Sequence, residues 1–359
     1  LFARAEINMG VEAFRDSLYS LLKRNTFLNI KFENMLDTLG EISRTDIRSL
    51  LGEWEKTTSL PFYSLGEPTL TKITNTGGEE FFVLKMLISN NSDYDGIIHM
   101  DIRKDGWWYQ PLEDPRAKTK IEMPAHTSKE FVSVWEDQIR NVEINTMVSG
   151  NLPNIISQDI NNVKQERNKI VKDSIYILPE SSFDLPGEII VDNEDSTLFI
   201  LSAPPIVGLL PKWLDEVEET PFKYSGISWW RPPLQWTATT NDRYYGKYIR
   251  SAFVIKSGDG SQTATWKVPV PEVGQYDLYY HVFKDDELRW NNNLQGEYHF
   301  KVKYGSEVED AYVNLRKANE GWEQLGSYYF DSDTIRVVLT DECKLRSVTA
   351  DAVKIVKRY

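Results

Sequence analysis

The sequence has little cysteine and no long apolar run, and each shortage excludes a class of protein. Cys343 is the one cysteine among 359 residues, so neither an intrachain disulfide framework nor a multi-cysteine metal cluster can form. No stretch approaches the ~20 apolar residues that a membrane-spanning helix needs. The longest candidate, at 200–210, is interrupted by Pro204 and Pro205. We therefore expect no membrane-spanning segment.

Histidine is also scarce, and the common catalytic motifs are missing. His99, His126, His281 and His299 are not arranged as H-E-x-x-H, the spacing that lets two imidazoles of one helix bind zinc. Neither the G-x-S-x-G motif of serine hydrolases nor a G-x-x-x-x-G-K-[ST] phosphate loop occurs. Carboxylates are so numerous that no pair of them indicates glycosidase chemistry. The chain as given is predicted not to be an enzyme.

Basic residues are outnumbered by acidic ones, 41 against 54, which leaves a formal net charge of −13. Nucleic-acid binding depends on Lys and Arg that neutralise phosphates, so we expect no nucleic-acid partner. The apolar share of 41% is enough to build sizeable cores in two or three domains.

Residues 1–63 have the periodicity of short helices. In the first long stretch Val11, Phe14, Leu18, Leu21 and Leu22 are predicted to lie on one face, and similar stripes follow at 35–42 and 47–54. Helices of this length bury little apolar surface by themselves. We expect them to pack against a domain that precedes them.

Residues 64–160 change to a period of two, which predicts an immunoglobulin-like β-sandwich of about seven strands. Trp107, Trp108 and Tyr109 follow a turn there and suit either a sugar platform or the filled end of the sandwich. The polar stretch 161–173 predicts a linker or an exposed helix, and we assign the whole of 161–186 as a linker.

Residues 187–359 alternate again and predict a second sandwich of jelly-roll type. The expected fold class is thus mainly β with an N-terminal helical segment and two β-sandwich domains. On the strands around them, His281 and His299 alternate with Tyr280 and Tyr298, so the two histidines should face away from the core.

Aromatic residues with polar neighbours are concentrated in this last segment. Sugar rings stack their C–H faces on Trp or Tyr, while Arg, Asn and acids bind the hydroxyl groups. The alternative is that Trp230 and Trp236 anchor the Pro232-Pro233 loop over the core. The candidate ligand-binding residues are Trp229, Trp230, Arg231, Trp236, Tyr244, Tyr245 and Trp290.

Three acids near the ends of the second sandwich form a candidate metal site. Asp192 and Glu194 follow its first predicted strand, and Asp351 precedes its last one. First and last strands are often neighbours in jelly rolls, so these oxygen ligands could bind a structural Ca²⁺. The alternative is that Asp192 and Asp351 only bind turn backbone and that no ion is present.

The last segment resembles the golvesin C-terminal-like domain, a carbohydrate-binding-like module of secreted bacterial proteins. That resemblance implies a galactose-binding-like β-sandwich and a role in glycan binding or envelope attachment. The turn at 229–233 is not part of the family pattern. The matching stretches are Tyr224-Ser225-Gly226, Trp236-Thr237, Tyr245-Gly246, Gly258-Asp259-Gly260, Ala264-Thr265-Trp266, and those at 271–279, 321–328 and 348–353.

Residues 1–63 resemble the end of the catalytic domain of aminopeptidase N-like zinc metallopeptidases, the gluzincins. The resemblance rests on Gly10-Val11-Glu12-Ala13-Phe14-Arg15, Gly52-Glu53-Trp54 and Leu60-Pro61-Phe62-Tyr63, and on the all-β domain that follows. In that family the zinc ligands and the transition-state Tyr precede this segment. The resemblance thus implies a catalytic domain upstream, where zinc would bind, and no catalytic residue in this chain.

Together these features favour the non-catalytic C-terminal region of a secreted, periplasmic or cell-surface bacterial aminopeptidase-like protein. Its expected partners are the upstream peptidase domain and a glycan or another component of the cell envelope. The alternative is a non-enzymatic surface protein whose two sandwiches bind carbohydrate or protein directly. A third interpretation, a purely structural brace, predicts that no aromatic cluster is exposed.

Overall fold

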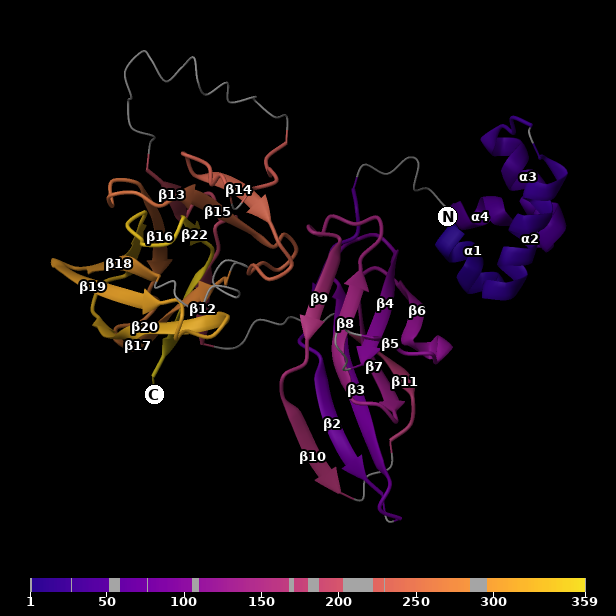
Figure 1. The fold of residues 1–359 in the computed structure, drawn as a ribbon, viewed down its shortest axis with the longest axis horizontal. Helices are drawn as coiled ribbons and strands as arrows, with labels where there is room; N and C mark the ends of the chain where they lie inside the picture. The colour runs from indigo at the N-terminus through magenta and orange to yellow at the C-terminus, as the bar shows by residue number, and fades with distance from the viewer. Residues whose placement is uncertain are drawn as a thin grey trace. The chain divides into compact units, whose positions relative to one another are not determined.

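The computed structural model describes residues 2–26, 28–51, 59–75, 77–104, 110–167, 171–179, 187–202, 222–228, 230–284 and 296–358. The chain divides into two compact units, Leu1–Ser182 and Phe183–Tyr359. Strands dominate both units (Figure 1), the α-helices of the described chain lie near its N-terminus, and a short 3-10 helix, η2 (Pro115–Ala117), precedes β6. The predicted fold class is confirmed.

The N-terminal segment contains α1 (Phe2–Met9), α2 (Val11–Arg24), α3 (Phe32–Ser43) and α4 (Ile47–Leu51). Gly10 separates the first two helices at φ 84°, a left-handed conformation that glycine adopts without steric cost. The helices share a small core made of Ala5, Phe14, Leu21, Leu36, Leu39 and Ile47. None of the helices in the described part of the chain is long and apolar enough to cross a bilayer.

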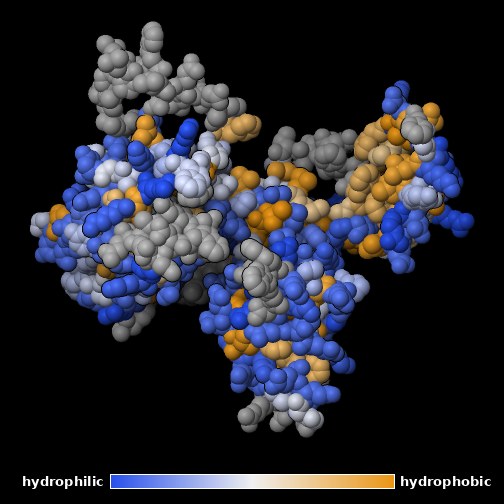
Figure 2. All heavy atoms as spheres, in the orientation of Figure 1, coloured by the Kyte–Doolittle hydropathy of each residue, from blue (hydrophilic) through white to orange (hydrophobic). Residues whose placement is uncertain are grey.

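The apolar stripe of α2 is only partly buried. Phe14 and Leu21 are buried, but Val11 is 61% exposed and Leu22 is 59% exposed. Tyr19, on the same side as these two, is 65% exposed. Figure 2 shows hydrophobic residues on the surface of this helical segment. The neighbouring helices of the described chain cover only part of the stripe, which agrees with the expectation that short helices bury little apolar surface by themselves.

Two sheets form the sandwich of the first unit. One sheet has the strand order β10-β2-β3-β7-β11, with β1 also paired to β3, and the other has the order β5-β4-β8-β9, with β6 paired to β4. Between them lies a core that includes Tyr63, Leu84, Met100 and Ile144. The strands are β1 (Tyr63–Leu65), β2 (Thr69–Thr74), β3 (Glu80–Asn90), β4 (Gly96–Lys104), β5 (Gln110–Pro111), β6 (Lys118–Met123), β7 (Thr127–Trp135), β8 (Ile139–Asn145), β9 (Ile155–Asp159), β10 (Val163–Arg167) and β11 (Ser174–Pro179).

The segment predicted as a linker supplies two strands of this sandwich. β10 pairs in parallel with β2, and β11 pairs antiparallel with β7. Backbone pairing needs no apolar side chains, so a polar sequence can form an edge strand. The linker prediction is therefore wrong for residues 163–167 and 174–179, while 168–170 and 180–186 lie outside the described residues. So do Trp107, Trp108 and Tyr109.

Three sheets build the second unit. A four-stranded sheet has the order β12-β23-β17-β20, a five-stranded sheet has the order β13-β16-β21-β18-β19, and β14-β15-β22 form a smaller one (Figure 1). The strands are β12 (Glu188–Val191), β13 (Phe199–Leu201), β14 (Thr237–Thr240), β15 (Ser251–Lys256), β16 (Thr263–Pro269), β17 (Gly274–Val282), β18 (Glu297–Tyr304), β19 (Glu307–Asn314), β20 (Gly321–Phe330), β21 (Thr334–Thr340), β22 (Ser347–Ala350) and β23 (Val353–Lys357).

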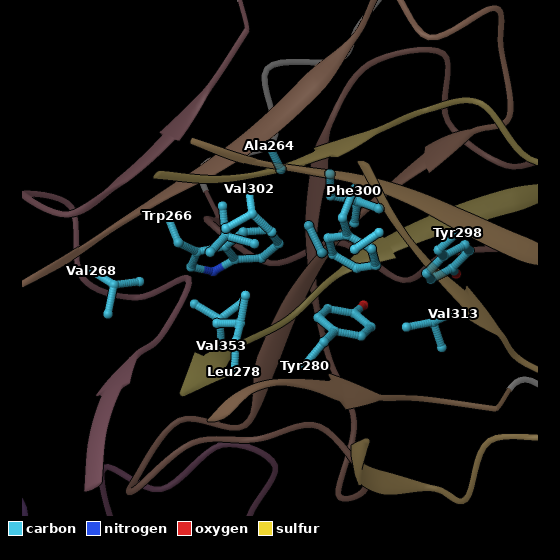
Figure 3. Close-up of a cluster of buried hydrophobic side chains, with 14 of the residues drawn as sticks. Ala264, Trp266, Val268, Leu278, Tyr280, Tyr298, Phe300, Val302, Val313 and Val353 are labelled. Atoms are coloured by element: carbon cyan, nitrogen blue, oxygen red, sulfur yellow. The ribbon is translucent and has the colours of Figure 1, made fainter. Parts of the chain in front are cut away.

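The core of the second unit is rich in aromatic rings, and the polar atoms of Trp266 and Tyr280 are hydrogen-bonded. Trp266, Tyr280 and Phe300 are completely buried among aliphatic side chains such as Leu278 (Figure 3). The Trp266 Nε1 donates to the carbonyl of Asp351 at 3.2 Å, and the Tyr280 hydroxyl donates to a carbonyl of β22. These bonds remove the cost of burying polar atoms, so the large rings stabilise the sandwich.

Leu278→Ala is expected to destabilise the second unit by about 2–5 kcal/mol, because it leaves a cavity in a core where Leu278 is completely buried. The measurement is hydrogen exchange of the β17 amides in the full chain. Val273→Ala, at an exposed position just before β17, serves as the control and should change exchange little. Equal effects of the two substitutions would contradict the assignment of this core.

Candidate functional site

The first and last strands of the second unit are neighbours and bring two predicted acids together. β12 pairs antiparallel with β23, and Val191 lies opposite Val353. Asp192 directly follows β12, and Asp351 lies two residues before β23 starts. Both carboxylates are therefore at the same end of this strand pair, close enough for the charge of Asp351 to raise the pKa of Asp192.

The carboxylate of Asp351 is completely buried and has specific partners. Its Oδ2 lies 2.8 Å from His281 Nδ1 and accepts from the Tyr245 backbone N–H at 3.1 Å. Burial raises the pKa of Asp351, while His281 and the Tyr245 N–H act in the opposite direction. Asp351 thus ties the loop that contains Tyr245 to strand β17.

Asp192 lies in a second set of hydrogen bonds. Burial, assisted by the charge of Asp351, raises the pKa of Asp192 to about 8. The backbone N–H of Asn193 donates to Asp192 Oδ1 at 2.7 Å. The amide of Asn193, in the orientation that satisfies its neighbours, donates to the same oxygen and to the carbonyl of Ser251.

The three acids of the predicted calcium site are engaged separately. Glu194 accepts from Ser251 Oγ and from the Tyr224 hydroxyl, and it forms an ion pair with Lys223. Within the described residues, no three His, Cys, Asp or Glu side chains are grouped so that they could hold a metal. The prediction that Asp192 and Asp351 bind turn backbone matches the bonds to Asn193 and Tyr245. Calcium binding itself stays a prediction.

An aromatic and charged group that the sequence did not reveal covers the outer face of the four-stranded sheet. His281 of β17 lies opposite Trp322 of β20, and their rings are 5.1 Å apart. Tyr245 packs on Trp322 at 5.1 Å as well. Lys354 of β23 lies over Trp322 at 4.9 Å and forms an ion pair with Glu188 at 2.9 Å.

This group is a closed assembly and not an open platform. Lys354 covers one side of both Trp322 and Tyr279, and Tyr245 and His281 also pack on Trp322, so these rings are less exposed than Trp230. The predicted outward direction of His281 is confirmed by its place beside Trp322. Only pairing of β17 with β20 and β23 creates the group, because its members are far apart in the sequence.

Trp230 occupies a different setting, in a tight turn. Ser228 and Arg231 pair as a β-bridge, and the Arg231 N–H donates to the carbonyl of Ser228 at 2.9 Å. The Trp230 side chain is 64% exposed, and the Arg346 guanidinium lies 5.1 Å from its ring centre. The Arg231 side chain is also exposed. A turn closed in this way holds a large ring out towards solvent.

The other predicted aromatic residues have structural positions. Trp236 packs partly buried against the core, as the alternative interpretation predicted, whereas the same prediction is wrong for the exposed Trp230. Tyr244 is buried and packs on Phe283 at 4.6 Å. Tyr245 belongs to the closed group around Trp322. Trp229 and Trp290 lie outside the described residues.

Comparison with known families supports the sequence resemblance in part. Residues 232–357 match the model of the Golvesin C-terminal domain. The matched range includes Trp236, Tyr245 and Asp351 and leaves Trp230 just outside. None of the curated proteins matches the chain. The resemblance of residues 1–63 to aminopeptidase N-like enzymes gains no support from these comparisons.

Solved structures give only distant likenesses. A β-glucuronidase of Bacteroides uniformis aligns at 12% identity over 89% of this chain and 32% of its own, with a TM-score of 0.24. A calcium-binding mutant of B. uniformis β-glucuronidase 2 aligns at 11% identity over 84% and 31%, with a TM-score of 0.22. The chain spans about a third of the length of these enzymes. Scores this low support no argument about function.

Stability should decline as the pH rises from about 4 to about 8. Asp192 has a native pKa of about 8 against 3.8 as its reference value, so the folded state binds more protons than the unfolded state across this range. The slope from this one proton is at most about 1.4 kcal/mol per pH unit. Asp192→Asn should flatten the decline, as measured by denaturant unfolding at pH 5 and pH 8.5.

The control for this experiment is Asp333→Asn, at an exposed turn position of the same unit. It should leave the dependence on pH as in the parent chain. A decline that persists unchanged in Asp192→Asn would show that other groups are responsible. Addition of Ca²⁺ at pH 8.5 tests the calcium prediction separately, since a bound ion would raise the melting temperature of the parent chain and not of Asp192→Asn.

Proposed function

We propose that residues 187–359 form a non-catalytic module that binds carbohydrate at a surface, with Trp230 as its central contact. The observation that supports this best is the large exposed ring in a closed turn, beside two arginines. A purely structural brace predicts no exposed aromatic cluster; of the three rings that decide this, Trp230 is exposed, while Trp229 and Trp290 lie outside the described residues. The match to the Golvesin C-terminal domain agrees with a carbohydrate-binding-like module.

The geometry supplies both kinds of contact that a sugar needs. The Trp230 ring can stack on the C–H face of a pyranose, and the guanidinium groups of Arg231 and Arg346 can donate hydrogen bonds to ring hydroxyls. Arg346 lies against Trp230 in the free protein, so part of this arrangement exists before binding. Contacts of the residues that follow the turn connect it to the sandwich. The carbonyl of Pro233 accepts from the Lys256 N–H at 2.7 Å, and Trp236 packs on the core.

A single site of this type binds weakly. An aromatic contact contributes about 0.5–1.5 kcal/mol beyond the area that it buries, and exposed hydrogen bonds compete with water. Such an affinity suits a module whose task is to hold a larger protein at a surface that offers many copies of the ligand. It does not suit a transport or storage protein.

We further propose that the larger protein is a secreted or envelope-exposed bacterial zinc aminopeptidase. The motif resemblance of residues 1–63 supports this, and so does the exposed apolar side of α2 formed by Val11, Tyr19 and Leu22. Exposed apolar surface of this kind is typical of a face that another domain covers. Zinc is expected only in that preceding domain, which would also be the partner of α2.

The sequence 50–120 residues upstream of Leu1 provides the direct test of the peptidase proposal. H-E-x-x-H there, followed by the third glutamate ligand, would support a zinc peptidase. Its absence would leave a pseudoenzyme or the alternative function, a non-enzymatic surface protein. In an extended polypeptide, Tyr19 should also become protected from oxidative labelling if the preceding domain covers α2.

Trp230→Ala is expected to lower the affinity of the full chain for its glycan by about tenfold, because the stacking surface is lost. Glycan-array binding identifies the ligand, and titration calorimetry with that ligand measures the change. Trp230→Phe should fall between the parent chain and Trp230→Ala. The matched control is Tyr329→Ala, which removes a ring exposed to a similar extent from β20 and should leave binding unchanged.

Far-ultraviolet circular dichroism of each variant shows whether the fold is retained. A flat array for the parent chain would count against sugar recognition. Equal binding by Trp230→Ala and the parent chain would move the site away from this turn.

A further inference from the structure

A row of basic side chains crosses the outer face of the five-stranded sheet. Lys267 of β16 lies directly opposite Arg336 of β21, and Arg336 lies directly opposite Lys303 of β18. Their sequence neighbours Trp266, Val302 and Val337 are completely buried in the core. Because side chains alternate between the two faces of a sheet, the three cations share the outer face.

The same face has a fourth cation and exposed apolar groups next to this row. Lys301, two residues before Lys303 on β18, lies opposite Asp310 of β19. Val308 is opposite Lys303 and is 59% exposed. Tyr312 is 56% exposed and stacks one side of its ring on His299, with the ring centres 4.9 Å apart and the planes nearly parallel.

The row has no acidic partners among the residues that the structure describes. None of the ion pairs within the described residues includes Lys267, Lys301, Lys303 or Arg336, although Asp310 lies opposite Lys301 in the strand register. Asp310 is engaged instead with His299 Nε2 at 2.7 Å. Like charges placed directly opposite each other destabilise a sheet, so this row has a cost in stability.

The cost is notable in a chain of this composition. Acidic residues outnumber basic ones by 54 to 41, so acids would be the commoner neighbours if charges were distributed without regard to function. β16, β21 and β18 are interior strands of their sheet, so the cations do not serve to protect a sheet edge from pairing. Three adjacent cations on central strands instead fit a partner that supplies the missing negative charges.

We propose that this face binds an acidic polysaccharide, a chain of sugar rings that bears carboxylate or sulfate groups. Strand spacing places the three cations over about 10 Å, which suits repeated anions on an extended polymer. The open side of Tyr312 lies about 13 Å further along the strands and offers a ring for stacking on a sugar. The surface therefore combines charge neutralisation with a contact that recognises sugar rings, and it uses residues other than Trp230.

The test compares dextran sulfate with neutral dextran of the same length, using the full chain at low and moderate salt. We expect binding to dextran sulfate that weakens as salt rises, and little binding to dextran. The double variant Lys303→Gln/Arg336→Gln should lower the affinity by about tenfold and reduce the dependence on salt. The control Lys317→Gln/Lys344→Gln removes the same charge from two exposed positions of the same unit and should bind as the parent chain does.

Tyr312→Ala should weaken binding and leave the dependence on salt unchanged, because it removes stacking and no charge. Equal losses in the two double variants would overturn the proposal in favour of a general effect of net charge. Binding of single-stranded DNA or of vesicles with anionic lipids as tightly as dextran sulfate would also overturn it, since the face would then recognise any polyanion. Trp230→Ala tests the proposed carbohydrate site at Trp230 separately, so one of the two proposals can fail while the other holds.

Discussion

The antiparallel pairing of β12 with β23 is the constraint on which the second unit depends. It joins the first and last strands of this unit, so both ends of a long segment meet in one sheet. The same pairing places Asp192 and Asp351 at one end of the two strands. Asp351 then binds His281 and the Tyr245 N–H, and so fixes the loop after β14 against β17. The end of this strand pair is therefore also the place where the polar cluster forms.

Burying two neighbouring carboxylates costs free energy unless each one is protonated or has hydrogen-bond partners for its charge. The two acids do this differently. Asp351 has an imidazole and a backbone N–H as partners, whereas the pKa of Asp192 rises to about 8. The closed aromatic group around Trp322 lies directly beside this cluster through His281. The polar cluster is therefore part of the scaffold, and the surfaces suited to ligands lie elsewhere in the unit.

Two surfaces of the second unit have features that a folded scaffold does not require. The turn at 228–231 exposes Trp230, although a polar residue would close the same turn. The outer face of the five-stranded sheet places Lys267, Arg336 and Lys303 side by side, although alternating charges would stabilise it more. Both features are compatible with a module that attaches a larger protein to a surface rich in sugars. The first unit shows a comparable feature in α2, whose exposed apolar side suits contact with another domain.

Much of the fold could be predicted from the sequence, because strands and helices each have a periodicity that a short stretch of residues reveals. Alternation over 264–282 and 298–302 correctly indicated the strands and the inward direction of Trp266, Tyr280 and Phe300. The polar sequence at 163–167 led to a wrong linker prediction. A strand forms through its backbone, and an edge strand can have polar side chains. Periodicity indicated the apolar stripe on α2 but not which of its residues are covered, since it does not show where the neighbouring helices pack.

The sequence by itself determined the β-rich fold class, the absence of a zinc helix motif and the golvesin-like stretches. It also indicated that Asp192 and Asp351 would lie near each other, because they flank the terminal strands of one sandwich. Only the tertiary structure decided which aromatic rings are exposed: Trp236 and Tyr244 are held by the core, while Trp230 is not. It alone revealed the Trp322 group and the basic row, because strand register brings together residues that are distant in the sequence, and no local pattern contains that information.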